Sequence, residues 1–234
     1  MEPINNISGT FGKKPAEIKT SVSSAVIRRL PRYHRYLGDL INNGRLRISS
    51  SELSKIMGVT ASQIRQDLNC FGGFGQQGYG YNIKFLYNKI SELLGAQEGF
   101  NAVIVGAGNL GRALAATHMF ERRGVNRLAM FDVDPSIIGT SIYGIPVYSV
   151  NDLSEFCKEH NVHIGVLTVP KEAASDITDI LATAGVRGIW NFANTELKTD
   201  HPGVIVENIH LGDSLMALCY EIKAENKKKE KDNV

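Results

Sequence analysis

The sequence predicts an α/β protein with two domains, in which a small helical domain ending in a β-hairpin precedes a doubly wound parallel sheet. Two observations predict this division. From Phe100 onward, short apolar runs alternate with amphipathic helices, which is typical of a parallel sheet covered on both faces. The charge also changes sign, since residues 1–84 carry 12 Lys and Arg against 5 Asp and Glu, whereas residues 85–234 carry 14 against 19. The 234 residues, 43% of them hydrophobic, suffice for one large or two small cores.

The two ends of the chain are expected to lie outside these domains. Residues 1–20 are polar, contain scattered Gly and Pro and lack periodicity, so we expect a flexible arm. Residues 225–234 are expected to form a charged tail. Between them, the small domain is predicted over residues 21–88, the sheet domain over 95–207 and a C-terminal helix over 208–224.

The composition argues against a membrane protein and against a metal or disulfide framework. No apolar run approaches the roughly 20 residues that span a bilayer, and the start of the chain lacks the apolar stretch of a secretory signal. Cys70, Cys157 and Cys219 lie far apart without ligand-like spacing, so we expect reduced, structural thiols. We therefore expect a cytoplasmic protein with no membrane partner and no bound metal.

The small domain is predicted to contain three helices and a hairpin. The first helix is capped by Ser23 or Ser24 and ends at Gly44. A second lies in "SSSELSKIMG", where a serine cap and an early glutamate precede apolar residues. A third starts near Thr60. After it, "GFGQQGYGYNIKFL" alternates glycine with aromatic and polar residues, which suits a short β-hairpin.

The third helix has the pattern of a DNA-recognition helix. Its apolar face is expected to pack into the core through Ala61, Ile64, Leu68 and Phe71. Its opposite face presents short polar and amide side chains, which can reach base edges, with an arginine that can take a phosphate or a guanine. A solvated surface helix is the alternative, but the preceding capped helix, the following wing and the positive charge favour a winged helix-turn-helix on double-stranded DNA. The candidate DNA-binding residues are Arg45, Arg47, Ser62, Gln63, Arg65, Gln66, Gln77, Tyr79 and Lys84.

A glycine-rich turn opens the sheet domain. Gly106, Gly108 and Gly111 form G-x-G-x-x-G between the strand "NAVIV" and the helix "LGRALAA", where glycines permit a tight turn, close approach of a pyrophosphate and close helix–strand packing. Asp132 ends the next strand, 21 positions after Gly111, and can accept hydrogen bonds from ribose hydroxyls. Because no Arg or Lys follows to hold a 2′-phosphate, NAD(H) is favoured over NADP(H). A structural glycine turn or a mononucleotide site is the alternative.

Further cofactor contacts are expected from the carboxyl ends of two later strands, which lie beside the glycine turn in a doubly wound sheet. These ends are "TVP" and "NFAN", although their polar residues also suit plain turns. The candidate cofactor residues in this domain are Gly106, Ala107, Gly108, Asn109, Leu110, Gly111, Asp132, Val133, Thr168, Val169, Pro170, Asn191, Phe192 and Ala193.

These parts, in this order, resemble the Rex family of redox-sensing transcriptional repressors. The resemblance runs from about Ser23 to Ile222 through "SSAVIRRLPRYHRYL", "RQDL", "VGAGNLG", "FDVDP", "LTVPKEAA" and "GIWNFA". It implies a homodimer whose winged helices bind operator DNA and whose Rossmann domains sense NADH against NAD+, so that NADH releases the operator. It also implies a domain-swapped C-terminal helix that crosses to the partner and brings Leu211 to the partner's nicotinamide pocket. The apolar stripe of that helix suits packing on its own chain or on another.

Several positions depart from the family pattern. Gln66 stands where lysine is common, and Gln77 stands where the wing usually has arginine. In relatives, an arginine matching Arg35 joins a network with a tyrosine and an aspartate, but this chain has Thr117 and His210 at those two places. We hypothesise that Asp213, one helical turn beyond His210, reaches Arg35 instead.

Two other functions fit parts of the sequence. An NAD-dependent oxidoreductase with an accessory helical domain would need an acid-base group such as His118, His163 or His210, yet no paired catalytic histidine and carboxylate is evident. A DNA-binding structural protein with a vestigial Rossmann fold would bind operator equally at any NADH level. We predict a regulator with no catalytic residues.

Overall fold

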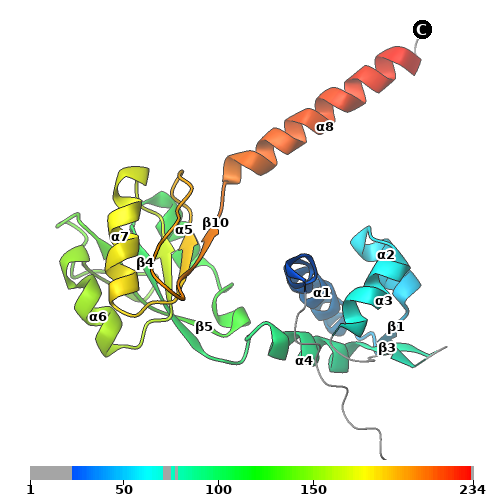
Figure 1. Ribbon diagram of the computed structural model, residues 1–234, viewed down its shortest axis with the longest axis horizontal. Coiled ribbons are helices and arrows are strands. Elements are labelled where there is room, and N and C mark those ends of the chain that lie inside the picture. Colours follow the sequence, from blue (N-terminus) through cyan, green and yellow to red (C-terminus); the bar gives the residue numbers. More distant parts are fainter. Residues whose placement is uncertain (1–22, 71–74, 77–78, 233–234) are drawn as a thin grey trace, which may run out of the picture. The chain divides into compact units, whose positions relative to one another are not determined.

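The computed structural model describes residues 23–70, 75–76 and 79–232, and the chain divides between Gly95 and Ala96 into two compact units (Figure 1). The arm predicted over residues 1–20 and the candidate Gln77 lie outside the described residues. The first unit extends past the predicted boundary at 88 because a helix follows the hairpin.

The first unit is a winged helix-turn-helix, as predicted. Its three antiparallel strands lie in the order β1-β3-β2. Its helices are α1 (Ser24–Asn42), α2 (Ser50–Met57), α3 (Ala61–Asn69) and α4 (Ile83–Leu93), and its strands are β1 (Arg47–Ile48), β2 (Gly75–Gln76) and β3 (Gly80–Asn82).

Local capping explains where the helices of this unit begin and end. Ser49 and Glu52 form a reciprocal capping box at the start of α2, and Gly58 ends that helix with φ 67°. The Thr60 hydroxyl accepts the Gln63 N–H at 3.1 Å and so fixes the start of α3. The helix that the sequence pattern missed, α4, is capped by Asn82, whose side chain accepts a backbone N–H.

The second unit is built on a seven-stranded sheet in the order β10-β9-β8-β4-β5-β7-β6, parallel except for the terminal pair β6 and β7. The strand order reverses at β4, which lies between β5 and β8. This is the Rossmann arrangement that the alternation predicted. The strands are β4 (Phe100–Val105), β5 (Val125–Asp132), β6 (Ser141–Ile142), β7 (Ile145–Ser149), β8 (Ile164–Leu167), β9 (Gly188–Asn191) and β10 (Ile205–Asn208), of which β6, β7 and β10 were not predicted.

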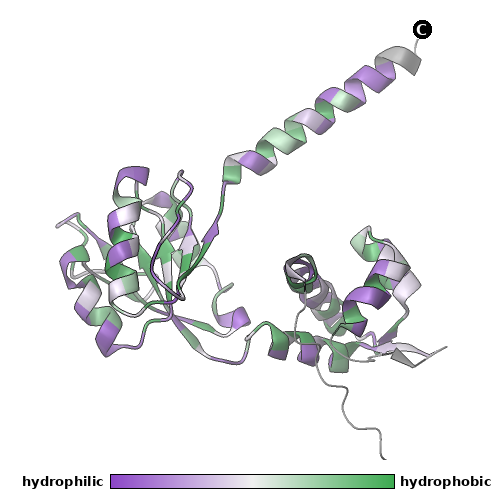
Figure 2. Ribbon diagram, in the orientation of Figure 1, coloured by the Kyte–Doolittle hydropathy of each residue, from purple (hydrophilic) through white to green (hydrophobic). Residues whose placement is uncertain are grey.

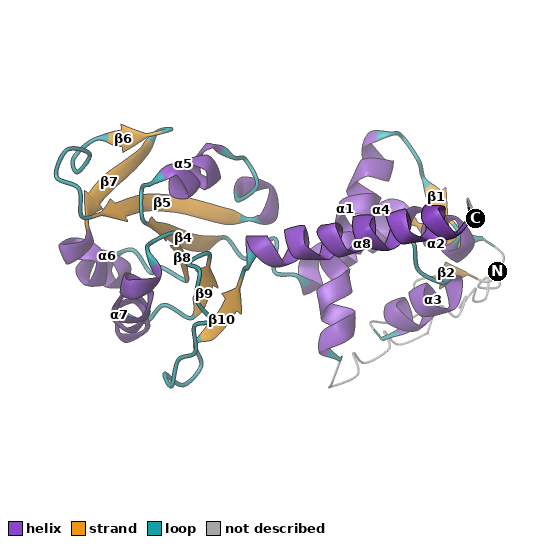
Figure 3. Cartoon of the chain, turned by 90° about the horizontal axis from the view of Figure 1, so that it is seen from above, coloured by secondary structure: helices purple, strands orange, loops and turns teal. Residues whose placement is uncertain are grey.

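Helices pack on both faces of this sheet. On one face, α6 (Leu153–Glu159) and α7 (Lys171–Thr183) enclose a core that includes Val103, Phe131 and Leu167. On the other face, α5 (Asn109–Ala116) packs with Phe120 over Ile104 and Met130. Figure 3 shows α5 on the opposite side of the strands from α6 and α7.

The C-terminal helix α8 (Leu211–Asp232) is longer than the predicted 208–224 helix and runs through most of the segment expected to be a charged tail. Hydrophobic residues recur along its first half (Figure 2). The side chains of Leu211, Leu215, Leu218 and Ile222 are exposed in the single chain. In the part of the chain that the structure describes, no helix meets the length and apolarity needed to cross a bilayer.

Candidate functional site

The glycine turn has the geometry that the sequence predicted for each glycine. Gly106 has φ 100°, and a Cβ there would lie 2.7 Å from the Thr168 carbonyl oxygen. A Cβ on Gly111 would collide with the Gly106 carbonyl oxygen, so only glycine lets α5 approach β4 this closely. A Cβ on Gly108 would meet nothing within 4 Å, which leaves open space beside the backbone. The turn is therefore tightly packed at Gly106 and Gly111 and open at Gly108.

The N-terminus of α5 faces this open space. Gly108 is its N-cap and offers no side chain to the free N–H groups of the first turn, which include those of Asn109 and Leu110. The helix begins its own hydrogen bonding when the Arg112 N–H reaches the Gly108 carbonyl at 2.9 Å. Unsatisfied N–H groups and the helix dipole together favour an anion such as a pyrophosphate.

Asp132 lies at the end of β5, next to the turn. Its Oδ2 accepts the Ala107 N–H at 2.6 Å, and its Oδ1 accepts the N–H groups of Val133 and Asp134 at 2.8 and 3.0 Å. These bonds fix the carboxylate beside the glycine turn. Because a carboxylate offers about four lone-pair sites, it can still accept a ribose hydroxyl.

Two side chains support the turn from within the protein. The Thr168 hydroxyl lies 2.7 Å from the Gly106 carbonyl oxygen and donates to it, so its proton serves the turn rather than a ligand. The neighbouring Val169 is half-buried, and Pro170 is the exposed N-cap of α7. Arg112, which sequence reasoning did not single out, donates from Nε to the Ala107 carbonyl at 2.7 Å.

Asn191 proves to be a positioning residue of the loop after β9. It is fully buried, donates from Nδ2 to the Thr195 carbonyl and to Asn208 Oδ1, both at 2.8 Å, and accepts the Ala193 N–H at 2.9 Å. Its polar atoms are occupied by the protein, and a direct cofactor contact by its side chain stays an untested prediction. Phe192 is half-buried, with its ring 4.7 Å from that of Trp190.

The predicted switch residues fall in both units. Arg35 of the first unit lies over the Tyr36 ring at 5.1 Å. In the second, the Thr117 hydroxyl donates to the Leu114 carbonyl at 2.9 Å, and His210 Nε2 lies 2.9 Å from Glu196 Oε2. The partner Glu196 was not foreseen from the sequence.

The remaining predicted switch residue, Asp213, and the predicted cofactor residue Leu211 lie on α8. Leu211 and Asp213 are both exposed in its first turn. A contact of Asp213 with Arg35 would join the two units and stays a prediction.

The recognition helix α3 presents most of its predicted polar face. Ser62, Arg65 and Gln66 are exposed, while Ile64 and Leu68 are buried in the core of the first unit. Arg65 donates from Nη1 to the Ser50 hydroxyl at 3.1 Å. Of the predicted core residues, Ala61 is only half-buried and Phe71 lies outside the described residues.

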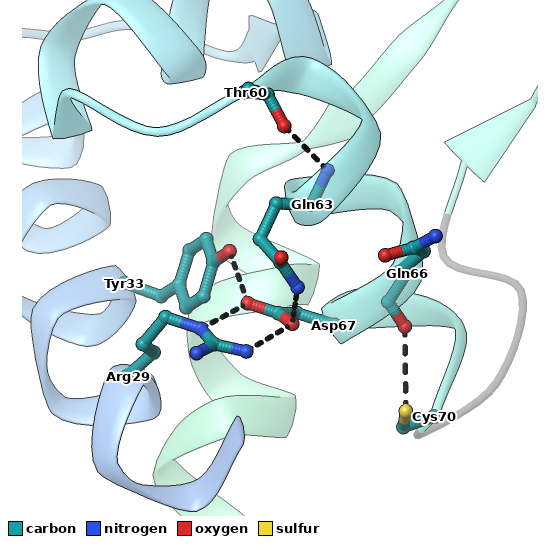
Figure 4. Close-up of polar contacts among 7 residues, drawn as sticks. All are labelled: Arg29, Tyr33, Thr60, Gln63, Gln66, Asp67 and Cys70. Atoms are coloured by element: carbon teal, nitrogen blue, oxygen red, sulfur yellow. Dashed lines mark hydrogen bonds and ion pairs between the residues drawn. The ribbon is translucent and has the colours of Figure 1, made fainter. Parts of the chain in front are cut away.

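One carboxylate on α3 is buried, and sequence reasoning missed it. Asp67 accepts a bidentate pair of hydrogen bonds from Arg29 at 2.7 and 2.8 Å, and one from the Tyr33 hydroxyl at 2.9 Å (Figure 4). Gln63 Nε2 donates to the same carboxylate at 2.8 Å, so its amide is turned toward Asp67. Burial alone would raise the pKa of Asp67, but the hydrogen bonds from Arg29, Gln63 and Tyr33 and the charge of Arg29 lower it below its ordinary value.

The basic candidates outside α3 are exposed, and two of them are already paired. Arg45 forms an ion pair with Glu52 at 2.7 Å, and Arg47 donates to the Tyr79 carbonyl at 3.3 Å. Lys84 lies on α4 and lines the same surface groove as Arg45. The Tyr79 side chain is exposed. All four are therefore placed where a polyanion can reach them.

One candidate acid-base histidine lies away from the expected cofactor crevice. His163 lies at the amino end of β8, away from the carboxyl ends of the strands where the cofactor is expected, and its Nδ1 accepts the Asn101 N–H at 3.0 Å. No group of three or more metal-ligating side chains occurs among them. Burial raises the pKa of the Cys157 thiol to about 12, so this cysteine is a structural residue.

Comparison with protein families gives two matches. The model described as "CoA binding domain" matches residues 97–195, which contain the glycine turn and most of the large sheet. The model described as "Putative DNA-binding protein N-terminus" matches residues 21–69, which contain α1 to α3.

Other comparisons match proteins over most of this chain. A protein of Thermoanaerobacter pseudethanolicus named "Redox-sensing transcriptional repressor Rex" is 50% identical over 207 residues, covering 88% of this chain and 92% of the relative. A protein of the same name from Caldicellulosiruptor bescii is 49% identical over 213 residues, covering 91% and 98%. Among solved structures, the repressor RSP with β-NAD+ and operator DNA is 50% identical with a TM-score of 0.82, covering 91% of this chain and 97% of that one. RSP with β-NADH is 47% identical, also with a TM-score of 0.82, over 91% of this chain and 99% of that one.

Proposed function

Because the chain belongs to the Rex family of redox-sensing transcriptional repressors, we propose that its winged unit holds operator DNA and that NADH at the Gly106–Gly111 turn releases it. The observation that carries this proposal is the junction of the glycine turn with Asp132, which forms a dinucleotide cradle in a chain that also has an exposed recognition helix. The relatives are named repressors, and the protein is a regulator rather than an enzyme.

The dinucleotide is NADH or NAD+ rather than a phosphorylated form. The pyrophosphate would lie over Gly108 at the N-terminus of α5, where the backbone is open. The adenosine ribose would then meet the Asp132 carboxylate, which is held in place by Ala107. A 2′-phosphate at that position would be repelled by the carboxylate charge, and so NADPH is excluded.

Preference for the reduced form follows from the charge of the nicotinamide ring. In NAD+ the ring is cationic, and removing a cation from water is costly unless it is paired. Phe192 lies at the carboxyl end of β9, and Leu211 of a second chain would close the other side of the ring. An apolar enclosure of this kind favours the neutral ring of NADH.

The functional unit is a homodimer with exchanged α8 helices. Two apolar surfaces of the single chain support this proposal. One is the exposed stripe of Leu211, Leu215, Leu218 and Ile222 on α8. The other is an apolar groove of about 400 Å³ on the α5 face of the large sheet, lined by Met119, Phe120, Val125, Ile164, Trp190 and Ile205. Surfaces of this kind are covered by a partner in stable assemblies.

DNA recognition is assigned to α3, with the surrounding basic residues on phosphates. Ser62, Arg65 and Gln66 are exposed on this helix and can reach base edges in the major groove. Arg47 and Lys84 supply positive charge for the backbone, which sets affinity rather than sequence preference. We also propose a cytoplasmic location, where such a protein meets both operator DNA and NADH.

Control of DNA by NADH requires that the cofactor bind one arrangement of the dimer better than the other. A nearly complete switch requires differential affinity of about 10⁴-fold, which is about 5.5 kcal/mol. Thermodynamic linkage then demands that operator DNA weaken NADH binding by the same factor.

The test is a mobility-shift titration of the full-length protein on a duplex that the protein itself enriches from a random-sequence pool. We expect NADH to release this duplex, while NAD+ and NADPH leave it bound. Release by all three dinucleotides would remove the assigned selectivity, and binding that is unchanged by NADH would exclude a redox sensor. Equal NADH affinity with and without the duplex would rule out the proposed linkage.

A further inference from the structure

We propose that Asp67 is a positioning residue for operator recognition, which sets the orientation of α3 and the amide of Gln63 from inside the winged unit without touching DNA. The inference rests on the proposed function, because it concerns how the recognition helix is aimed. The observation behind it is a fully buried carboxylate on α3 that gathers side chains from α1 and from α3 itself (Figure 4).

The carboxylate joins two helices that are distant in the sequence. Arg29 and Tyr33 lie one turn apart on α1, and both donate to Asp67 from 38 and 34 positions away. The Arg29 side chain is 26% exposed, whereas that of Asp67 is 1% exposed, so the negative end of the ion pair is the one enclosed. A bidentate pair fixes angle as well as distance, because two parallel N–H···O bonds require the planes to align.

Helix α1 also makes a hydrogen bond to α2, the helix that precedes α3. Arg32 of α1 donates from Nη2 to the Met57 carbonyl at 2.9 Å, at the C-terminus of α2. Helices α2 and α3 are therefore each attached to α1, through Met57 and through Asp67. These two attachments add directional contacts to the core packing of Ile64 and Leu68, which also holds α3 in place.

Gln63 connects the buried carboxylate of Asp67 to the part of α3 that is proposed to read bases. Its backbone N–H is held by Thr60, and its side-chain Nε2 is held by Asp67 one turn later. The Gln63 amide is consequently held toward the interior, while Ser62 before it in the sequence and Gln66 three positions later are both exposed. Loss of the Asp67 carboxylate would free the amide to compete with these neighbours for solvent and for bases.

A role in stability alone does not explain this arrangement well. Replacing a buried ion pair by apolar residues of similar volume is often neutral or stabilising, whereas removing one partner is costly. A carboxylate that receives four hydrogen bonds defines one geometry, and an apolar contact at the same place would permit several. Recognition of bases depends on that single geometry.

The experiment compares affinity for the enriched operator duplex with affinity for a scrambled duplex of equal length, and uses the full-length protein. The first variant is Asp67→Asn, which keeps the shape of the side chain. Its matched control is Glu92→Gln on α4, which removes an exposed carboxylate paired with Lys89 at 2.7 Å. We expect Asp67→Asn to weaken operator binding at least tenfold and to change binding of the scrambled duplex and of NADH less than twofold. The control should change none of the three.

A second pair of variants separates positioning from folding. The triple variant Arg29→Met, Tyr33→Phe, Asp67→Leu replaces the ion pair by apolar packing and leaves no buried Tyr33 hydroxyl without its acceptor. We expect it to unfold at or above the temperature of the unmodified protein while operator binding stays weak. Tyr33→Phe removes a single hydrogen bond, and we expect about a threefold loss of operator affinity even if Asp67→Asn does not fold.

Three results would overturn the inference alone: wild-type operator affinity in Tyr33→Phe or Asp67→Asn, parallel loss on both duplexes, or full operator affinity in the apolar triple variant. If the unmodified protein enriches no duplex, the proposed function fails first and the inference with it.

Discussion

The Asp132 carboxylate accepts a hydrogen bond of 2.6 Å from the Ala107 N–H and so ties the end of β5 to the first turn of the glycine loop. One side chain thereby shapes the turn and, in the proposed function, also accepts the ribose hydroxyl. Because a hydrogen bond to a charged group contributes about 1.5–3 kcal/mol, Asp132→Ala should weaken NADH binding by about tenfold to a hundredfold. Fluorescence titration with NADH and NADPH measures this, and the ratio of the two affinities should fall toward one. An unchanged ratio of the two affinities would show that Asp132 does not contact the ribose.

Gly111→Ala should abolish NADH binding and leave operator binding insensitive to NADH. The added Cβ has no room, since it would strike the Gly106 carbonyl oxygen and lie 2.8 Å from Thr168 Oγ1. Gly108→Ala is the matched variant, because its Cβ would meet no protein atom within 4 Å. It should keep the thermal stability of the unmodified protein and lose affinity only for the dinucleotide. A destabilised Gly108→Ala protein would contradict this division.

The winged unit should lose stability in acid through Asp67. The pKa of Asp67 in the folded protein lies below its ordinary 3.8, so the carboxylate contributes its full stability above about pH 4, and that stability is lost as the pH falls through the lower, folded value. Hydrogen exchange of α3 amides between pH 2 and 5 should show this loss of protection. The Asp67→Asn protein should show a flatter dependence, and an equally steep one would assign the effect to other carboxylates.

Charge on the apolar stripe of α8 should prevent assembly. Leu215→Glu with Leu218→Glu places two carboxylates among exposed apolar side chains, and a dimer would have to bury them unpaired. Sedimentation should then show monomers that have lost the response to NADH. Lys228→Glu, on the same helix but outside the stripe, is the control and should remain dimeric. Monomeric unmodified protein would contradict the exchange of α8.

Asp213→Ala should weaken the release of operator by NADH while NADH affinity remains measurable. The expectation follows from the hypothesis that Asp213 reaches Arg35 in place of the missing tyrosine and aspartate. His210→Gln is the comparison, because His210 already lies 2.9 Å from Glu196 and should affect release less. Equal release in the unmodified protein and in Asp213→Ala would dispose of the hypothesis.

The sequence predicted the parts of the fold that depend on local pattern. The glycine turn was recognisable because Gly106, Gly108 and Gly111 each have a steric task, and the caps at Ser49 and Thr60 follow directly from side-chain chemistry. Strand β7 was missed because Pro146 interrupts a short run near the sheet edge. The extension of α8 was missed because its Lys- and Glu-rich end has the composition of a solvated tail, yet pairs such as Glu225 and Lys229 are spaced to support a helix.

The candidate site was predictable only where its residues have one plausible role. Thr168 and Asn191 lie at the expected strand ends, but their hydrogen bonds go to the protein, and only the three-dimensional contacts show that. The burial of Asp67 could not be predicted, because an acidic residue next to Leu68 also fits an exposed helix surface. Its partners Arg29 and Tyr33 lie on a different helix. Long-range pairing of this kind leaves no periodic signal.

The attachment of α3 to α1 from beneath has a consequence for how such repressors diverge. Since the anchoring atoms of Asp67 face the interior, the outward positions Ser62 and Gln66 can be exchanged one at a time without loosening the domain. New operator preferences can thus arise by single substitutions on α3 while the rest of the winged unit stays the same. The set of regulated genes can then change while the dinucleotide-binding unit is unaltered.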